Sequence, residues 1–290
     1  MEDWFYFIGW ILSVATVVGN GFIVLLIAKR TRLRSSSNWL VLSLALADFG
    51  VGVSLFPSGY LCGKIACNMR VYMASFWFFT HSSVTNLCTL TWDRYIAIVH
   101  PFKYITCMTA RRPGIAIALA WSIPLAISLS LALGMYATSS PTAWKILRLT
   151  GVSAFDISAC VLLFYLISRL LFVARRKAQE MSVIRRNDLF IELRNPSSVE
   201  CISTCRPKKP KTRLFLTTIV TFFLGCHAVI NSFVLYMTIS SDISNFSLFS
   251  AILVLMLVIN SAVNPLVYAF LKQDIKRELK LLVCGEKERN

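Results

Sequence analysis

The sequence has 290 residues, of which 56% are hydrophobic and 15% are charged, and its mean hydropathy is +0.65. This composition excludes an ordinary soluble domain, because the apolar residues also occur in long blocks. A helix that crosses a bilayer needs about 20 apolar residues. Seven stretches meet this need, at roughly 5–28, 38–61, 70–97, 113–135, 149–174, 214–239 and 247–270. We therefore predict an all-α membrane protein, with a bundle of seven transmembrane helices over residues 1–270.

The formal net charge of +16 is distributed unevenly between the two sides of the predicted bundle. Of the 30 Lys and Arg residues, those that fall on the side of the N-terminus are Lys64, Arg70, Lys145 and Arg148. The positive-inside rule then predicts an extracellular N-terminus and a cytoplasmic C-terminus, and we expect the plasma membrane as the location. The basic excess reflects this topology and attraction to anionic membrane lipids, so we expect no nucleic-acid partner.

The second apolar segment contains a carboxylate, Asp48, about ten residues from its start. An acid at that depth costs about 2.5–3.5 kcal/mol, so it is expected to face the bundle interior and to have partners or a function. Hydroxyl and amide side chains recur in other segments. One carboxylate among them suits Na⁺ or an ordered water cluster, and the alternative is a network that only ties helices together. The candidate ligands are Asp48, Ser83, Asn260, Ser261 and Asn264.

Two of the nine cysteines, Cys62 and Cys67, lie in the loop after this segment, near the outer face. They can pair locally, although closeness in sequence does not establish the geometry. Near the other end of the chain, Asn245 begins a formal N-glycosylation motif. Cys284 follows an amphipathic pattern, which suggests palmitoylation with a free thiol as the alternative.

The third apolar segment ends in Asp93-Arg94-Tyr95, and Pro101 and Phe102 follow in a loop. Taken alone, the acid and base can be a charged helix end that extends to water. An exposed Phe beside a basic helix end instead suggests contact with a partner.

The segments after residue 149 supply three further features. Asp156 lies near mid-depth, where we expect it to pair with His81 or to meet a ligand. Residues 176–211 are charged and contain RNPSS and RPKKPK, so we predict a flexible cytoplasmic loop there. Residues 271–290 alternate basic and apolar positions at helical spacing, which predicts an amphipathic helix on the membrane surface and a short tail.

The seventh segment contains Asn264-Pro265 and, three residues later, Tyr268. Pro265 removes a backbone donor and kinks a helix. Asn264 can satisfy the carbonyl that is freed, and Tyr268 places a hydroxyl at the inner end. The alternative is a membrane proline that is merely tolerated.

Over essentially its whole length, the sequence resembles the rhodopsin-like (class A) G-protein-coupled receptors. The residues that carry this resemblance are, in chain order, Asn20, Asp48, Asp93-Arg94-Tyr95 with Pro101, Trp121, Tyr165 and Asn264–Tyr268. The outer loop before residue 149 lacks the usual cysteine, as it does in melanocortin-like, cannabinoid-like and lysophospholipid-like receptors. The resemblance leaves the subfamily unresolved and suggests a melanocortin-, adenosine- or cannabinoid-like group. The resemblance implies that an extracellular ligand selects a state in which the sixth helix swings outward and opens a cleft for a heterotrimeric G protein. It assigns coupling to Asp93, Arg94, Tyr95, Pro101, Phe102, Tyr165, Asn264, Pro265 and Tyr268, and it places a Na⁺ site at Asp48.

Departures from the family concern the ligand end of the bundle. Phe76 stands where amine receptors carry an acid, Val258 replaces the retinal lysine, and His227 replaces a tryptophan. We expect His227 to be a neutral imidazole bonded to Asn260 or water rather than a pH sensor. Apolar walls with few polar points suit a lipid-like or weakly charged ligand, with ordinary helix packing as the alternative. The candidate pocket is Phe76, Trp77, Thr80, His81, His227, Asn231 and Val254.

Lys209 and Lys211 stand where some relatives carry an acid that locks Arg94, so we expect appreciable signalling without ligand. A transporter or channel is the alternative function, but the sequence has no convincing internal repeat. No HExxH, GxSxG or paired acidic motif appears, so we predict no enzyme activity. We expect no cofactor other than a candidate bound Na⁺.

Overall fold

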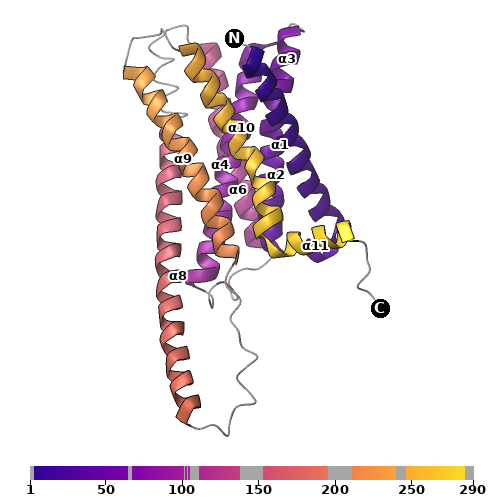
Figure 1. Ribbon diagram of the computed structural model, residues 1–290. Coiled ribbons are helices and arrows are strands. Elements are labelled where there is room, and N and C mark those ends of the chain that lie inside the picture. The colour runs from indigo at the N-terminus through magenta and orange to yellow at the C-terminus, as the bar shows by residue number, and fades with distance from the viewer. Residues whose placement is uncertain are drawn as a thin grey trace.

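The computed structural model describes residues 3–64, 67–100, 102, 104, 111–137, 153–194, 211–239 and 246–284. Within these ranges the chain is helical apart from short connections, and seven long helical segments lie side by side (Figure 1). The elements are α1 (Asp3–Lys29), η1 (Thr31–Leu33), α2 (Ser36–Ser54), α3 (Phe56–Lys64), α4 (Met69–Val99), α6 (Arg111–Ala137), α8 (Ala154–Arg194), α9 (Lys211–Ile239), α10 (Phe246–Leu271) and α11 (Gln273–Cys284).

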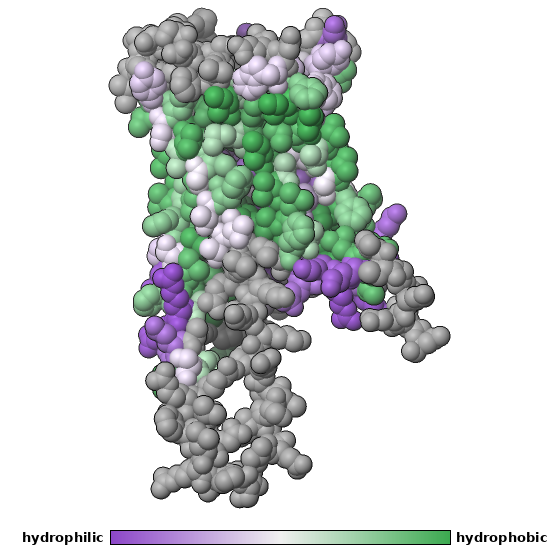
Figure 2. Space-filling model, viewed as in Figure 1, coloured by the Kyte–Doolittle hydropathy of each residue, from purple (hydrophilic) through white to green (hydrophobic). Residues whose placement is uncertain are grey.

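Five of these segments are long and apolar enough by composition to cross a membrane: α1, α2 continued through α3, α6, α8 and α10. The apolar part of α9 is shorter, at Thr217–Phe233. α4 is 31 residues long, but it carries hydroxyl, amide and histidine side chains through its buried length. On the face shown in Figure 2, hydrophobic residues form a broad band across the bundle, and the hydrophilic residues of α11 lie directly below it. The predicted all-α membrane bundle is confirmed.

α4 occupies the middle of the bundle and packs against α2, α6 and α8. α1 packs against α2 and α10, and α9 joins α8 to α10. Buried apolar side chains form two clusters. The larger lies toward α11 and includes Leu44, Phe223 and Tyr268, and the smaller lies toward the N-terminus and includes Phe76 and Val258.

Two glycines let helices approach closely. A Cβ added at Gly50 of α2 would lie 2.1 Å from the ring of Phe79 on α4. A Cβ at Gly19 of α1 would lie 3.1 Å from the Pro265 side chain on α10. A side chain at Gly50 would force the Phe79 ring to move, whereas one at Gly19 would be a tight contact that Pro265 could meet only by a small shift.

The outer end of α2 is broken at Leu55, and α3 continues with Pro57 in its first turn, where a missing backbone donor is tolerated. Cys62 near the end of α3 is bonded to Cys67, with the two Cα atoms 5.0 Å apart. The local disulfide that the sequence allowed is therefore formed.

α8 is longer than expected. The sequence predicted a flexible loop from residue 176, whereas the helix continues to Arg194 and projects well beyond the bundle (Figure 1). No proline or glycine interrupts this stretch, and Arg176 Nε lies 3.0 Å from Glu180 Oε1 one turn later, a spacing that stabilises helices. The prediction was wrong for residues 176–194, and 195–210 lie outside the described residues.

The predicted amphipathic helix is present as α11, with Ile275 fully buried against the bundle. Cys284 is its last residue and remains a candidate for palmitoylation. Asn245 lies outside the described residues, so its glycosylation remains a prediction.

Candidate functional site

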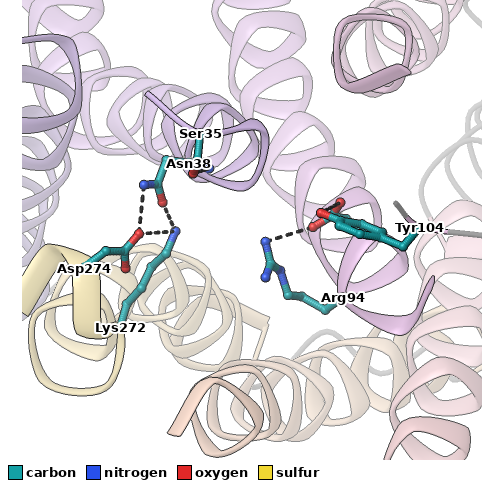
Figure 3. Close-up of polar contacts among 7 residues, drawn as sticks. Ser35, Asn38, Arg94, Tyr104, Lys272 and Asp274 are labelled. Atoms are coloured by element: carbon teal, nitrogen blue, oxygen red, sulfur yellow. Dashed lines mark hydrogen bonds and ion pairs between the residues drawn. The ribbon is translucent and has the colours of Figure 1, made fainter. Parts of the chain in front are cut away.

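The last turns of α4 hold an ion pair at the inner end of the bundle. Arg94 Nη2 lies 3.0 Å from Asp93 Oδ2, and 2% of the Asp93 side chain is exposed. The Tyr104 hydroxyl donates to Asp93 Oδ1 at 3.2 Å (Figure 3). Burial and the Asp93 carboxylate raise the pKa of the Tyr104 phenol above its ordinary 10.0. Sequence reasoning predicted the role of Asp93 and Arg94 but missed Tyr104, because no motif links this loop residue to the acid.

The other predicted coupling residues of this region lie apart. The Tyr95 ring stacks on Trp92 with centroids 5.8 Å apart. Phe102 is 85% exposed, as expected for a docking residue, while Tyr165 faces outward from α8 and is 53% exposed. The contact expected between Tyr165 and Arg94 in an open state therefore remains a prediction. Pro101 lies outside the described residues.

Asp48 is the centre of a buried polar cluster between three helices. Ser83 of α4 donates to Asp48 Oδ1 at 2.6 Å, and the Asn264 amide of α10 donates to Oδ2 at 2.7 Å. Ser261 of α10 is a further polar neighbour of the same carboxylate. Asn264 thus contacts Asp48, with which the sequence had grouped it as a candidate Na⁺ ligand, rather than the carbonyl freed by Pro265, which the sequence also offered as its partner.

The donor set around Asp48 fits a hard monovalent cation. It consists of one carboxylate, two hydroxyls and an amide, all with oxygen atoms that Na⁺ accepts. Asn20 of α1 donates to the Ser261 carbonyl at 3.1 Å, and its own Oδ1 is buried without a hydrogen-bond partner among the described residues. Asn260 is buried on α10 one residue away from Ser261. Hydrogen bonds therefore connect three of the five predicted ligands, Asp48, Ser83 and Asn264, while Ser261 and Asn260 lie beside them.

A second network extends from α6 to α4 through α2. The Trp121 indole donates to Ser43 Oγ at 2.9 Å, and Ser43 donates to Asn86 Oδ1 at 2.7 Å. Thr85 also donates to the Ala120 carbonyl at 2.6 Å. Trp121 was singled out in the sequence, but its partners are small polar residues that carry no distinctive pattern.

The aromatic members of the candidate pocket lie together toward the outer end. The rings of Phe76 and Trp77 have centroids 5.2 Å apart, and Trp77 stacks on His81 at 5.6 Å. Val254 packs against the same cluster. Thr80 donates to the Phe76 carbonyl at 2.9 Å, and Asn231 donates to the His227 carbonyl at 3.0 Å. These two polar side chains therefore bond backbone groups of their own helices.

His227 has a different partner from the one that the sequence suggested. Its Nδ1 lies 3.1 Å from Asp156 Oδ2 on α8, and its ring stacks on Phe223 with centroids 4.0 Å apart. The predicted bond to Asn260 or water and the predicted pairing of Asp156 with His81 are both corrected. The rotation of α8 against α9 decides which side chains meet, and a single sequence does not encode this register locally.

Lys272, at the junction of α10 and α11, is the centre of a contact that sequence reasoning missed. Its Nζ donates to Asn38 Oδ1 of α2, and Asp274 Oδ2 accepts from Asn38 Nδ2 at 2.8 Å (Figure 3). Lys272 Nζ also lies 3.9 Å from Asp274 Oδ2. Burial lowers the pKa of Lys272 from its ordinary 10.5 to about 8. Arg30, after α1, lies 3.9 Å from Glu278 and adds a second tie to α11.

Comparisons with known proteins agree with this arrangement. A family described as "7 transmembrane receptor (rhodopsin family)" matches residues 19–268. The chain is 25% identical to trace amine-associated receptor 8a of Rattus norvegicus, over 94% of this chain and 84% of the relative. It is 27% identical to trace amine-associated receptor 9 of Mus musculus, over 94% and 82%. It is also 24% identical to octopamine receptor beta-2R of Chilo suppressalis, over 95% and 78%.

Proposed function

Because the chain belongs to the rhodopsin family of seven-transmembrane receptors and is a G-protein-coupled receptor, we propose that it transmits the binding of an extracellular ligand to a heterotrimeric G protein at the end that carries α11. The excess of Lys and Arg in the loops at this end supports a cytoplasmic location for it and an N-terminus outside the plasma membrane. The family is a receptor family, and a transporter or channel is not favoured.

The observation that carries this proposal is the Asp93–Arg94 pair beside an exposed Phe102. In the proposed cycle α9 moves away from α4, Arg94 leaves Asp93 for the G protein and Tyr165, and Tyr268 turns toward the opened cleft. Phe102 docks on the G protein. The ligand drives this change through its higher affinity for the open state.

We propose that Na⁺ binds at Asp48 and stabilises the closed bundle. The positive charge of the ion would neutralise a carboxylate that α2, α4 and α10 enclose. Ser83 and Asn264 orient that carboxylate through their hydrogen bonds. Their removal from Asp48 on opening would weaken ion binding, which is how the ion would favour the closed state.

We propose a ligand that is lipid-like or weakly charged. Several relatives are named as receptors for trace amines or octopamine, but Phe76 is apolar and buried at the position of the amine-binding acid. Phe76, Trp77 and Val254 form an aromatic and aliphatic wall, and Thr80 and Asn231 already bond their own helices. This wall offers an amine no countercharge.

Nucleotide exchange on a purified G protein tests the coupling proposal. Purified native receptor in lipid nanodiscs is expected to accelerate exchange, and Arg94→Ala is expected to reduce it strongly because the coupling cation is lost. Arg112→Ala, an exposed arginine at the start of α6, serves as the matched control. Undiminished exchange by correctly folded Arg94→Ala would contradict the assigned role. Ion or solute flux across proteoliposomes without any exchange would instead support a transporter or channel.

A further inference from the structure

The middle of the bundle contains an acid and a histidine that join two helices. Asp156 of α8 and His227 of α9 are 3.1 Å apart, and their side chains are 7% and 0% exposed. An ionisable side chain inside a membrane bundle is costly and is retained where it pairs or functions. Here it occupies the contact between α8 and the helix that the proposed opening displaces.

The pair keeps unused hydrogen-bonding capacity. Asp156 Oδ1 and His227 Nε2 are both buried, and neither has a hydrogen-bond partner among the described residues. Each unpaired buried group costs about 1–3 kcal/mol. The His227 ring stacks on Phe223, and an apolar side chain could make the same packing contact without leaving buried polar atoms unpaired. Packing alone therefore does not account for an acid and a histidine at this contact.

The surroundings supply no permanent positive charge. Within the described part of the chain, the titratable groups that interact with the pair are His81 and Cys88 of α4 and Cys160 of α8. α10, which packs on α9, contains no acidic, basic or histidine residue. An ionised Asp156 is therefore balanced locally when His227 takes up a proton.

We propose that Asp156 and His227 form a proton-binding site, and that the bound proton holds α9 against α8. With the proton on the imidazole, the two side chains form an ion pair across the helix contact. Separation of the helices removes the carboxylate from the imidazolium, so the open state binds the proton more weakly. By linkage, acid then favours the closed state and lowers ligand-independent activity.

This inference rests on the proposed movement of α9, and it adds a regulatory ligand, the proton, to the receptor. Because the closed state takes up one proton more than the open state, the equilibrium between the closed and open states changes by at most about tenfold per pH unit.

The decisive measurement is the ratio of basal nucleotide exchange at about pH 8 to that at about pH 6, with purified receptor and G protein. We expect the native chain to give a ratio of several-fold. Asp156→Asn keeps an oxygen acceptor but removes the charge, and His227→Gln removes the titrating ring. For both variants, the ratio of exchange at about pH 8 to that at about pH 6 is expected to fall toward the ratio measured for the G protein without receptor. The chain has three histidines, and the exposed His100 at the end of α4 provides the control His100→Gln, which should keep the native ratio.

A second readout needs no G protein and separates this inference from the coupling proposal. The thermal unfolding midpoint is measured for purified native receptor and for both variants at about pH 8 and about pH 6. On this change of pH, the midpoint of the native receptor is expected to rise relative to the midpoints of Asp156→Asn and His227→Gln. A native exchange ratio equal to that of the G protein alone, or variants that keep the native ratio and the native pH dependence of unfolding, would overturn the proton site. Absent exchange at every pH would contradict coupling, and the thermal comparison would still decide the proton site.

Discussion

At the scale of single residues, Asp48 shows how a bundle accommodates a buried charge. Its two oxygens accept hydrogen bonds from Ser83 and Asn264, which come from two different helices. Hydrogen bonds to a charged group contribute about 1.5–3 kcal/mol each. Asp48 thereby ties α2 to α4 and α10, and it remains the one formal charge of the cluster.

Sodium is expected to raise the thermal midpoint of the native receptor, and Asp48→Asn is expected to abolish that rise. Asn preserves the volume and an oxygen acceptor, but it lacks the charge that attracts the cation. The comparison uses sodium chloride against choline chloride at equal ionic strength, because salt also screens surface charges. Glu180→Gln, an exposed carboxylate on α8, should keep the native response. An equal sodium effect in Asp48→Asn would contradict the site.

The sequence predicted the members of the Asp48 cluster but not the partner of His227. Asp48, Ser83 and Asn264 belong to a constellation that the resemblance carries as a set. Asp156 and His227 depart from the family pattern, so their meeting depends on the rotation of α8 against α9. Tyr104 and Lys272 were missed for a related reason, since their partners Asp93 and Asn38 come from other segments of the chain.

At the scale of elements, α11 is held in place by polar contacts as well as by its apolar face. Ile275 enters the larger buried cluster, while Lys272 and Asp274 both bind Asn38 of α2. The amphipathic pattern predicted the helix itself. The attachment to α2 was not predicted, because a lysine beside the membrane is ordinarily expected to extend to water.

Burial of Lys272 predicts a stability that changes at alkaline pH. Its pKa is about 8 in the folded receptor and returns to its ordinary 10.5 on unfolding. Between these two pKa values the unfolded chain binds more protons than the folded receptor, so the free energy of unfolding rises with pH. Below about pH 8 Lys272 is charged in both states, and the full cost of burying its charge lowers the free energy of unfolding. Lys272→Met should lack this rise when unfolding is measured at about pH 7.5 and about pH 9.5.

The exposed Lys276→Met on the same helix controls for the general effect of pH on the receptor. A difference between native chain and Lys272→Met that stays constant across the two pH values would contradict the burial effect.

At the scale of the whole molecule, seven helices and their order along the chain were predictable from apolar blocks. The prediction succeeded because bilayer thickness fixes the length of each block. The prediction of a flexible loop was wrong in the part of α8 that projects beyond the bundle, where bilayer thickness sets no limit and charged residues are compatible with either a solvated helix or a flexible loop.

The receptor is expected to signal appreciably without ligand. Among the described side chains, the ion pair of Arg94 is with its neighbour Asp93 on the same helix, so it does not restrain α9. Lys209 and Lys211 stand where an acid would lock Arg94, and both lie outside the described side chains. A second-messenger reporter should show basal output above cells that lack the receptor, and Lys211→Glu should lower it. Lys276→Glu on α11 controls for the added charge, and low basal output with verified surface expression would contradict the expectation.

The projecting part of α8 has a mechanical consequence. A flexible loop loses about 1–2 kcal/mol of backbone conformational entropy for each residue that a partner orders. The stretch up to Arg194 is already helical, so a protein that docks along it is spared that loss. The projecting part of α8 also extends well beyond the other helices (Figure 1), so a small rotation of α8 inside the membrane would move its far end through a larger distance.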